Sequence, residues 1–102
     1  MGTKYDVEDI PKSHRSDVEK AVKILERAGC REIYLFGSIV TGQVTPESDV
    51  DLAVRGIPPA SFFDVYGQLI AHLDHPVDLV DLEGVDRFSR LLQTEGQLYR
   101  VI

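Results

Sequence analysis

Residues 37–54 read GSIVTGQVTPESDVDLAV and decide the fold of this chain. The stretch begins with a Gly-Ser turn that follows an apolar strand pattern, and it ends in a second strand pattern at about 50–55. In an extended strand, residues i and i+2 lie on the same face about 6 to 7 Å apart. Asp49 and Asp51 therefore share one face of this predicted strand, while the apolar residues that alternate with them face a core.

The two neighbouring aspartates indicate a metal site. Carboxylates held this close repel each other and raise each other's proton affinity unless a cation lies between them. Mg²⁺ fits such a site because it binds carboxylate oxygens and keeps positions open for substrate phosphates. The glycine of Gly37-Ser38 allows the backbone to approach a ligand closely, and the serine supplies a hydroxyl and an N–H. A short helix over 38–41 would also direct free amides towards an anion.

A third carboxylate is expected from the apolar run 77–82, which contains Asp78 and Asp81. These two aspartates have opposite parity, so a regular strand can direct one of them towards the first pair. We favour Asp78, which lies inside the strand pattern, where an unpaired carboxylate would be costly to bury. Asp81 lies near the strand end and could instead accept hydrogen bonds from amides of the following turn or helix. Both assignments remain open from the sequence.

Three motifs, at residues 36–42, 48–54 and 77–82, together resemble the minimal nucleotidyltransferases of the DNA polymerase beta superfamily. More narrowly, they resemble the antitoxin-type members that are encoded beside HEPN-domain toxins. Ten residues separate the Gly-Ser pair from the first aspartate, which is a fairly specific match. The closing segment 88–99 also looks like the last helix and tail of that family, so the resemblance covers nearly the whole chain.

The resemblance implies an α+β nucleotidyltransferase fold, with a small mixed three-stranded sheet and helices packed mainly on one face. It implies transfer of AMP, or another nucleoside monophosphate, from a nucleoside triphosphate to a hydroxyl of a protein partner. Asp49, Asp51 and Asp78 would be the catalytic residues and the ligands of Mg²⁺, with two ions expected. Gly37, Ser38 and Asp49 would bind the nucleotide, with ATP as the donor. The partner would be a HEPN ribonuclease toxin, silenced by AMP on a tyrosine.

One position departs from the family pattern. Members often carry Ala-Arg-Gly shortly after the Gly-Ser pair, whereas this chain has Val-Thr-Gly at 40–42. The missing arginine removes a bidentate phosphate ligand. A non-catalytic antitoxin or assembly subunit that neutralises its partner by binding alone is therefore the alternative. A receiver-like phospho-acceptor domain would also have an acidic Mg²⁺ pocket, but no lysine follows a strand at a suitable place.

Composition narrows the class of protein. A chain of 102 residues is expected to form a single domain over 1–102, with an irregular start over 1–11. The net charge of −6 argues against direct nucleic acid binding, which depends on cationic contacts to phosphates. No apolar stretch approaches the length of a membrane span, and the first residues lack a signal-peptide core, so we expect a cytoplasmic protein. We expect a hetero-oligomer with the partner, or a homodimer when the chain is alone.

Apolar periodicity predicts the remaining elements. A first helix is expected from Ser13 or Ser16 to the stop at Gly29, and the first strand at 32–36. The later elements are expected as a long helix after Pro58-Pro59, a strand at 76–82 and a helix at 85–95 that includes Val85.

Three other residue types invite an interpretation. The aromatic side chains expected in the core are Phe62, Phe63 and Phe88. His72 and His75 are interpreted as a solvated helix end rather than a zinc site, and Cys30 as a buried structural thiol.

Overall fold

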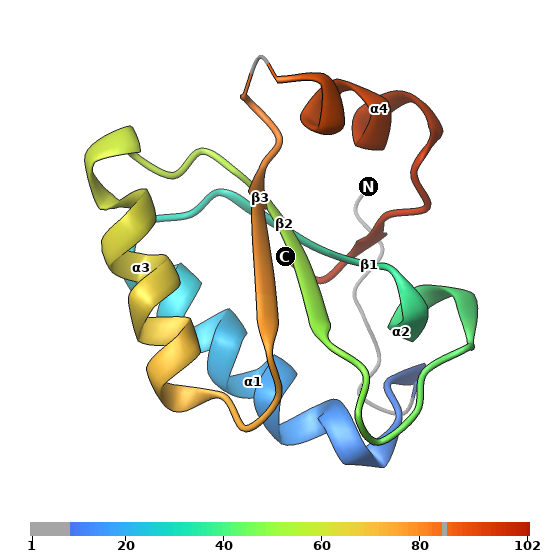
Figure 1. The fold of residues 1–102 in the computed structure, drawn as a ribbon. Helices are drawn as coiled ribbons and strands as arrows, with labels where there is room; N and C mark the ends of the chain where they lie inside the picture. The colour runs from blue at the N-terminus through green and yellow to red at the C-terminus, as the bar shows by residue number, and fades with distance from the viewer. Residues whose placement is uncertain (1–8, 85) are drawn as a thin grey trace.

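The computed structural model describes residues 9–84 and 86–102. The elements are α1 (Lys12–Arg27), β1 (Glu32–Phe36), α2 (Ser38–Thr41), β2 (Val50–Arg55), α3 (Pro59–His72), β3 (Val77–Asp81), α4 (Arg87–Glu95) and β4 (Tyr99–Arg100) (Figure 1). The predictions of β1, α2 and β2 are confirmed to the residue. Residues 1–8 of the expected irregular start, and Val85 of the expected last helix, lie outside the described residues.

The helix starts differ from the predicted ones. The first helix begins at Lys12 after Pro11, and no side chain caps it, so the prediction of a serine cap is wrong. The fixed φ of Pro11, −54°, directs the chain into the helix, and its carbonyl accepts a hydrogen bond from the N–H of His14. The last helix begins at Arg87, two residues after the predicted start, because the Asp86 carboxylate accepts from the N–H of Ser89.

Over the described residues, the sheet has four strands in the order β3-β2-β1-β4, so the expected three-stranded sheet is wrong. Strand β1 runs antiparallel to both β2 and β4, whereas β2 and β3 are parallel. The added strand contains two residues, Tyr99 and Arg100, which pair with Leu35 and Tyr34. Two residues are too few for period-2 alternation to appear in the sequence, which is why the prediction missed this strand. The mixed α+β fold is confirmed.

The two long helices cover one face of the sheet. Helices α1 and α3 lie side by side there (Figure 1) and enclose the main core. The strand residues on this face are Ile33, Leu35, Val50, Leu52, Val54, Val77 and Leu79. On the opposite face, α4 covers one end, where Leu92 packs with Ala53 and Leu82.

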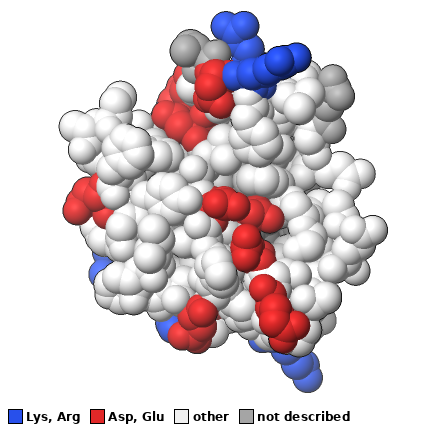
Figure 2. Space-filling model, viewed as in Figure 1, with Lys and Arg blue, Asp and Glu red and all other residues white. Residues whose placement is uncertain are grey.

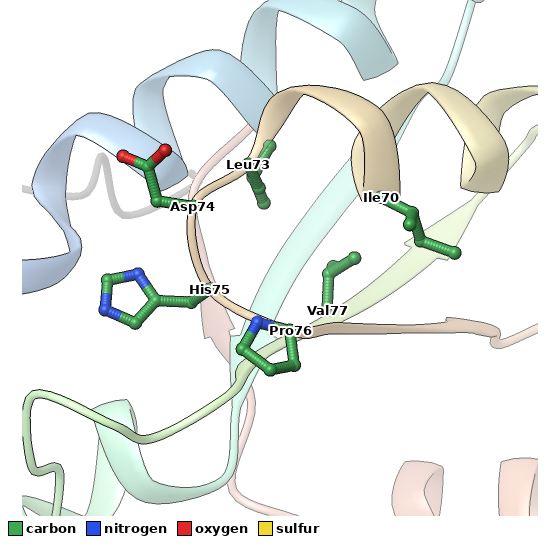
Figure 3. Close-up of a pocket in the computed structure, with 6 residues that line it drawn as sticks. All are labelled: Ile70, Leu73, Asp74, His75, Pro76 and Val77. Carbon is green, nitrogen blue, oxygen red and sulfur yellow. The ribbon is translucent and has the colours of Figure 1, made fainter.

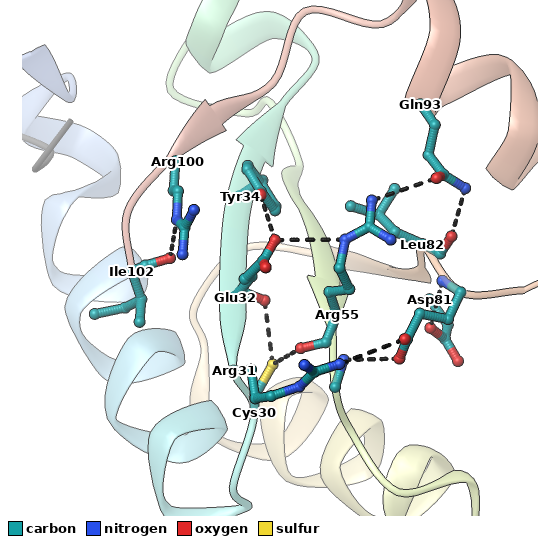
Figure 4. Close-up of polar contacts among 12 residues, drawn as sticks. Cys30, Arg31, Glu32, Tyr34, Arg55, Asp81, Leu82, Gln93, Arg100 and Ile102 are labelled. Atoms are coloured by element: carbon teal, nitrogen blue, oxygen red, sulfur yellow. Dashed lines mark hydrogen bonds and ion pairs between the residues drawn. The ribbon is translucent and has the colours of Figure 1, made fainter. Parts of the chain in front are cut away.

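Polar contacts hold α4 at that end of the sheet. The Arg55 guanidinium, at the end of β2, donates to Gln93 Oε1 of α4 at 3.3 Å (Figure 4). The Gln93 amide donates in turn to the carbonyl of Leu82, and Arg55 also pairs with Glu32 at 3.4 Å. Because Arg55 and Asp51 are four residues apart on an extended strand, this attachment leaves the Asp51 end of the face open.

Two of the three aromatic side chains expected in the core are exposed. Phe63 is 80% exposed and Phe88 is 51% exposed, so the prediction is wrong for both, while Phe62 is half-buried. Helix α3 buries Val65 and Leu69, and Phe63 lies about 200° around the helix from Val65. Over residues 9–84 and 86–102, none of the helices combines the length and the apolar character needed to cross a bilayer.

Candidate active site

The pairing of β2 with β3 assembles an acidic cluster on the open part of the sheet. Asp51 of β2 lies opposite Asp78 of the parallel strand β3 and opposite Phe36 of β1. Asp49 comes two residues before Asp51, ahead of the strand. Oxygens of the Asp49, Asp51 and Asp78 carboxylates all lie within 4.8 Å of one another. The structure therefore brings together the three aspartates that the sequence singled out.

Asp81 lies apart from this cluster. Its Oδ1 accepts a hydrogen bond of 2.9 Å from the N–H of Glu83, so it stabilises the turn after β3. Asp78 is exposed at the sheet edge, and its Oδ1 receives a long contact of 3.5 Å from the Tyr66 hydroxyl. The same hydroxyl donates to the carbonyl of Val77 at 3.2 Å. Between the two aspartates that the sequence left open, Asp78 is the one beside Asp51.

The Asp51 carboxyl has a raised pKa. Burial raises its pKa first, and the charges of Asp78 and Asp49 raise the pKa further, to about 6. A hydrogen bond with Asp78 favours the protonated form as well. Figure 2 shows acidic groups in the middle of this face and basic groups of the described residues at its margins, so no Lys or Arg of those residues is seen to offset the repulsion in the middle. A divalent cation bound by these oxygens would relieve it.

Gly37 is required where β1 meets α2. Its φ of 75° lies in the left-handed region that favours glycine. A Cβ built on Gly37 would collide with the carboxylate of Asp51, which occupies the space beside the glycine. The backbone turn and the acidic cluster are therefore in direct contact. Ser38 begins α2 at this point and is half-buried.

Sequence reasoning missed a polar group behind the cluster. His14 and Asp17 of α1 are buried, and Asp17 binds His75 at 2.7 Å, so the interpretation of His75 as a solvated helix end is wrong. The spacing of His14 and Asp17 could have indicated their burial. They fall on the same helical stripe as Val18 and Ala21, which are buried. His72 is exposed, as expected.

The turn between α3 and β3 carries a shallow depression of about 410 Å³ (Figure 3). Its lining is Ile70, Leu73, Asp74, His75, Pro76 and Val77. In Figure 3 the side chains of Asp74 and His75 project to one side of the turn, whereas Ile70 and Val77 lie on the other. The three clustered aspartates do not line it, so this depression is separate from the acidic cluster.

Comparison with known proteins gives consistent matches. The family described as Polymerase beta, Nucleotidyltransferase matches residues 19–98. The protein adenylyltransferase MntA of Thermococcus cleftensis is 37% identical over 83 residues, which cover 78% of each chain. A crystal structure of a toxin–antitoxin with AMP-PNP is 30% identical with a TM-score of 0.61, over 79% of this chain and 70% of that one. A solved structure assigned to a minimal nucleotidyltransferase is 25% identical with a TM-score of 0.62, over 94% and 98%.

Proposed function

This chain belongs to the polymerase beta nucleotidyltransferase family, and we propose that it transfers AMP from ATP to a hydroxyl of a protein partner. The observation that carries the proposal is the convergence of three carboxylates within 4.8 Å, beside a glycine turn. The relative of 37% identity that is named a protein adenylyltransferase supports a protein as the acceptor. The structural neighbour solved with AMP-PNP, an ATP analogue, supports an adenine nucleotide as the donor.

The three carboxylates suit Mg²⁺, because their oxygens are hard ligands and their mutual repulsion falls when a cation binds. We assign Asp49, Asp51 and Asp78 as its ligands, with two ions in the complete site. Bound Mg²⁺ would neutralise phosphate charge and stabilise the attacking and leaving oxygens. The chain itself supplies a fixed β2 register and a half-buried Asp51 at the centre of the site.

Asp78 is assigned to the acceptor side of the reaction. It is exposed on the edge strand β3, where a hydroxyl from another protein can approach. The acceptor oxygen would form a bond to the α-phosphorus of ATP while the bond from that phosphorus to pyrophosphate breaks. The hydroxyl proton would pass to Asp78, and pyrophosphate would leave.

Gly37 and Ser38 are assigned to the β- and γ-phosphates. The glycine has no side chain to block a phosphate, and the serine offers its hydroxyl and backbone N–H at the start of α2. Thr41 occupies the place where the family often has an arginine, and its hydroxyl donates to the carbonyl of Ser38 at 3.4 Å. A threonine supplies no positive charge, which favours weak nucleotide affinity or the alternative of an antitoxin that acts by binding alone.

The proposed partner is a HEPN ribonuclease toxin that accepts AMP on a tyrosine, in a hetero-oligomer with this chain. The proposal is supported by the resemblance of the sequence motifs and by a structural neighbour that is a toxin–antitoxin. A cytoplasmic location follows from this proposal.

Intact mass spectrometry tests the reaction. The chain, Mg²⁺-ATP and the toxin are incubated together, and the toxin should gain the mass of one or more AMP groups. The double variant Asp49→Asn, Asp51→Asn should bind the toxin but add no AMP. A stable complex without any AMP, formed by the unaltered chain, would instead support neutralisation by binding alone.

A further inference from the structure

Two buried polar side chains and one half-buried one join α1 to the two segments that carry the clustered aspartates. His14 and Asp17 of α1 are 0% and 2% exposed. His75 lies in the turn before β3, and its ring stacks on that of His14 with centroids 3.9 Å apart. Burying charged or polar groups is costly unless they are hydrogen-bonded, so the contacts of this group define what it does.

The Asp17 carboxylate accepts three hydrogen bonds from the turn before β3. The backbone N–H groups of Asp74 and His75 donate to it at 2.9 and 2.8 Å, and His75 Nδ1 donates at 2.7 Å. Burial raises the pKa of Asp17, but these bonds outweigh burial and hold the pKa below its usual value. Asp17 is therefore ionised at neutral pH, and it fixes the turn from which β3 starts.

The partners of His75 define its protonation state. Its Nδ1 faces the Asp17 carboxylate, and its Nε2 faces the carbonyl of Pro46 at 2.8 Å. Both partners are acceptors, so both contacts are hydrogen bonds only when both ring nitrogens carry a proton, as in an imidazolium. The bond to Asp17 raises the pKa of His75, against the effect of burial.

The ring of His14 makes two polar contacts. Its Nε2 donates to the carbonyl of Ser48 at 2.7 Å, whereas its Nδ1 lies 2.7 Å from the Ser13 hydroxyl, which can donate to it.

Both rings therefore hold the Asp49 loop, defined as residues 42–49. Their acceptors are the carbonyls of Pro46 and Ser48, which lie three residues and one residue before Asp49. The N–H of Val50 donates to the carbonyl of Pro76 at 2.8 Å, so the start of β2 is joined to the same turn. Through this turn, the group fixes the Asp49 loop relative to the strand that carries Asp78.

We propose that the Asp17–His75 ion pair, with His14 stacked on it, is a positioning device that holds the Asp49 loop in metal-binding geometry and releases it when His75 loses its proton. The inference rests on the proposed metal role of Asp49. A neutral His75 can donate through only one ring nitrogen. Either Asp17 or the carbonyl of Pro46 then faces the lone pair of the other nitrogen and loses its hydrogen bond. The groups that face His75 are Asp17 and His14 from α1, Asp74 from its own turn and the carbonyl from the Asp49 loop.

Calorimetric titration with Mg²⁺ alone, from about pH 6.5 to about pH 9, tests the device. The affinity of the unaltered chain should fall as His75 deprotonates. His75→Gln should bind Mg²⁺ about 10 to 100 times more weakly near neutral pH, as expected when a residue that orients a metal ligand is lost. The variant should also lose the alkaline decrease. His72→Gln is the matched control, because His72 is exposed and contacts the carbonyl of Gln68. It should behave like the unaltered chain.

NMR of the unaltered chain adds a test that does not depend on a variant. Long-range ¹H–¹⁵N spectra should show two protonated nitrogens in the His75 ring near neutral pH, and the Mg²⁺ affinity should change over the same pH range as this signal. A neutral His75 ring near neutral pH would overturn the inference. So would an Mg²⁺ affinity that does not change as the ring titrates, or one that is the same in the His75→Gln variant as in the unaltered chain. If the unaltered chain does not bind Mg²⁺ at any pH, the metal role of the aspartates fails together with the inference.

Discussion

Asp51→Asn should stabilise the metal-free protein above about pH 6. Asparagine keeps the shape of the side chain beside Gly37 and removes one of three clustered charges. The pKa of Asp51 is raised from 3.8 to about 6, and this difference corresponds to at most about 3 kcal/mol. Asp51 is half-buried, so solvent screens part of the interaction, and we expect about 1 to 2 kcal/mol.

The sign of the effect follows from proton binding. Because the pKa of Asp51 is higher in the folded state, the folded protein binds more protons than the unfolded chain between about pH 4 and about pH 6. The contribution of Asp51 to the free energy of unfolding therefore falls as the pH rises, and this fall is complete above about pH 6. Asp17, with its lowered pKa, and His75, with its raised pKa, also titrate, but they are the same in both proteins. Their effects cancel in the difference between variant and unaltered chain.

Urea denaturation with a chelator present, from about pH 4 to about pH 8, measures this difference. It should be near zero at the acidic end and reach its full value above about pH 6. Asp64→Asn is the control, since Asp64 is exposed on α3, and it should change stability by no more than about 0.5 kcal/mol. A variant less stable than the unaltered chain at pH 8, or a difference that does not depend on pH, would refute the electrostatic reasoning. Added Mg²⁺ should stabilise the unaltered chain more than the variant.

Two further predictions distinguish the structural role of the Gly37 turn from the role of Asp78 in AMP transfer. Gly37→Ala should cost about 1 to 3 kcal/mol in urea denaturation and weaken Mg²⁺ binding, because a Cβ there meets both a positive φ and a neighbouring carboxylate. Gly29→Ala has a φ of 87° but open space around it, and Gly29 lies outside the Asp49 loop, so it should cost less and leave Mg²⁺ binding unchanged. Asp78→Ala should slow AMP transfer by about a hundredfold or more, by intact mass spectrometry, while nucleotide binding largely survives. Asp81→Ala should mainly lower stability, by about 0.5 to 2 kcal/mol, and equal losses of transfer in both variants would contradict the assignment.

The parts predicted correctly from sequence are those with strong local patterns. The alternation along β1 and β2 indicated their bounds, and the parity of the aspartates limited which of them could share a face. The choice between Asp78 and Asp81 needed the strand pairing, because it is the parallel register that places Asp78 opposite Asp51. The exposure of Phe63 could not be predicted from hydrophobicity, because a folded surface retains many apolar side chains.

The Asp17–His75 pair shows a different limit. Its two residues are 58 positions apart, and the pair forms where the turn before β3 meets α1. Apolar periodicity indicates which face of a helix is buried, but not which distant polar group will meet it there. A histidine and an aspartate on the buried stripe of α1 indicate that such a partner exists, since buried polar groups need hydrogen bonds.

The packing of β2 explains how the sheet tolerates its clustered charges. Val50, Leu52 and Val54 lie on the strand face opposite to that of Asp51 and are each fully buried against the helical layer. Burying three such side chains contributes about 5 to 9 kcal/mol, which exceeds the cost of at most about 3 kcal/mol, from burial and then repulsion, that the raised pKa of Asp51 represents. A slip of one residue in the strand would place Asp51 in the core and the apolar side chains in water. The core on one face therefore holds the repelling carboxylates together on the other. A bound cation removes this repulsion, which makes its binding more favourable.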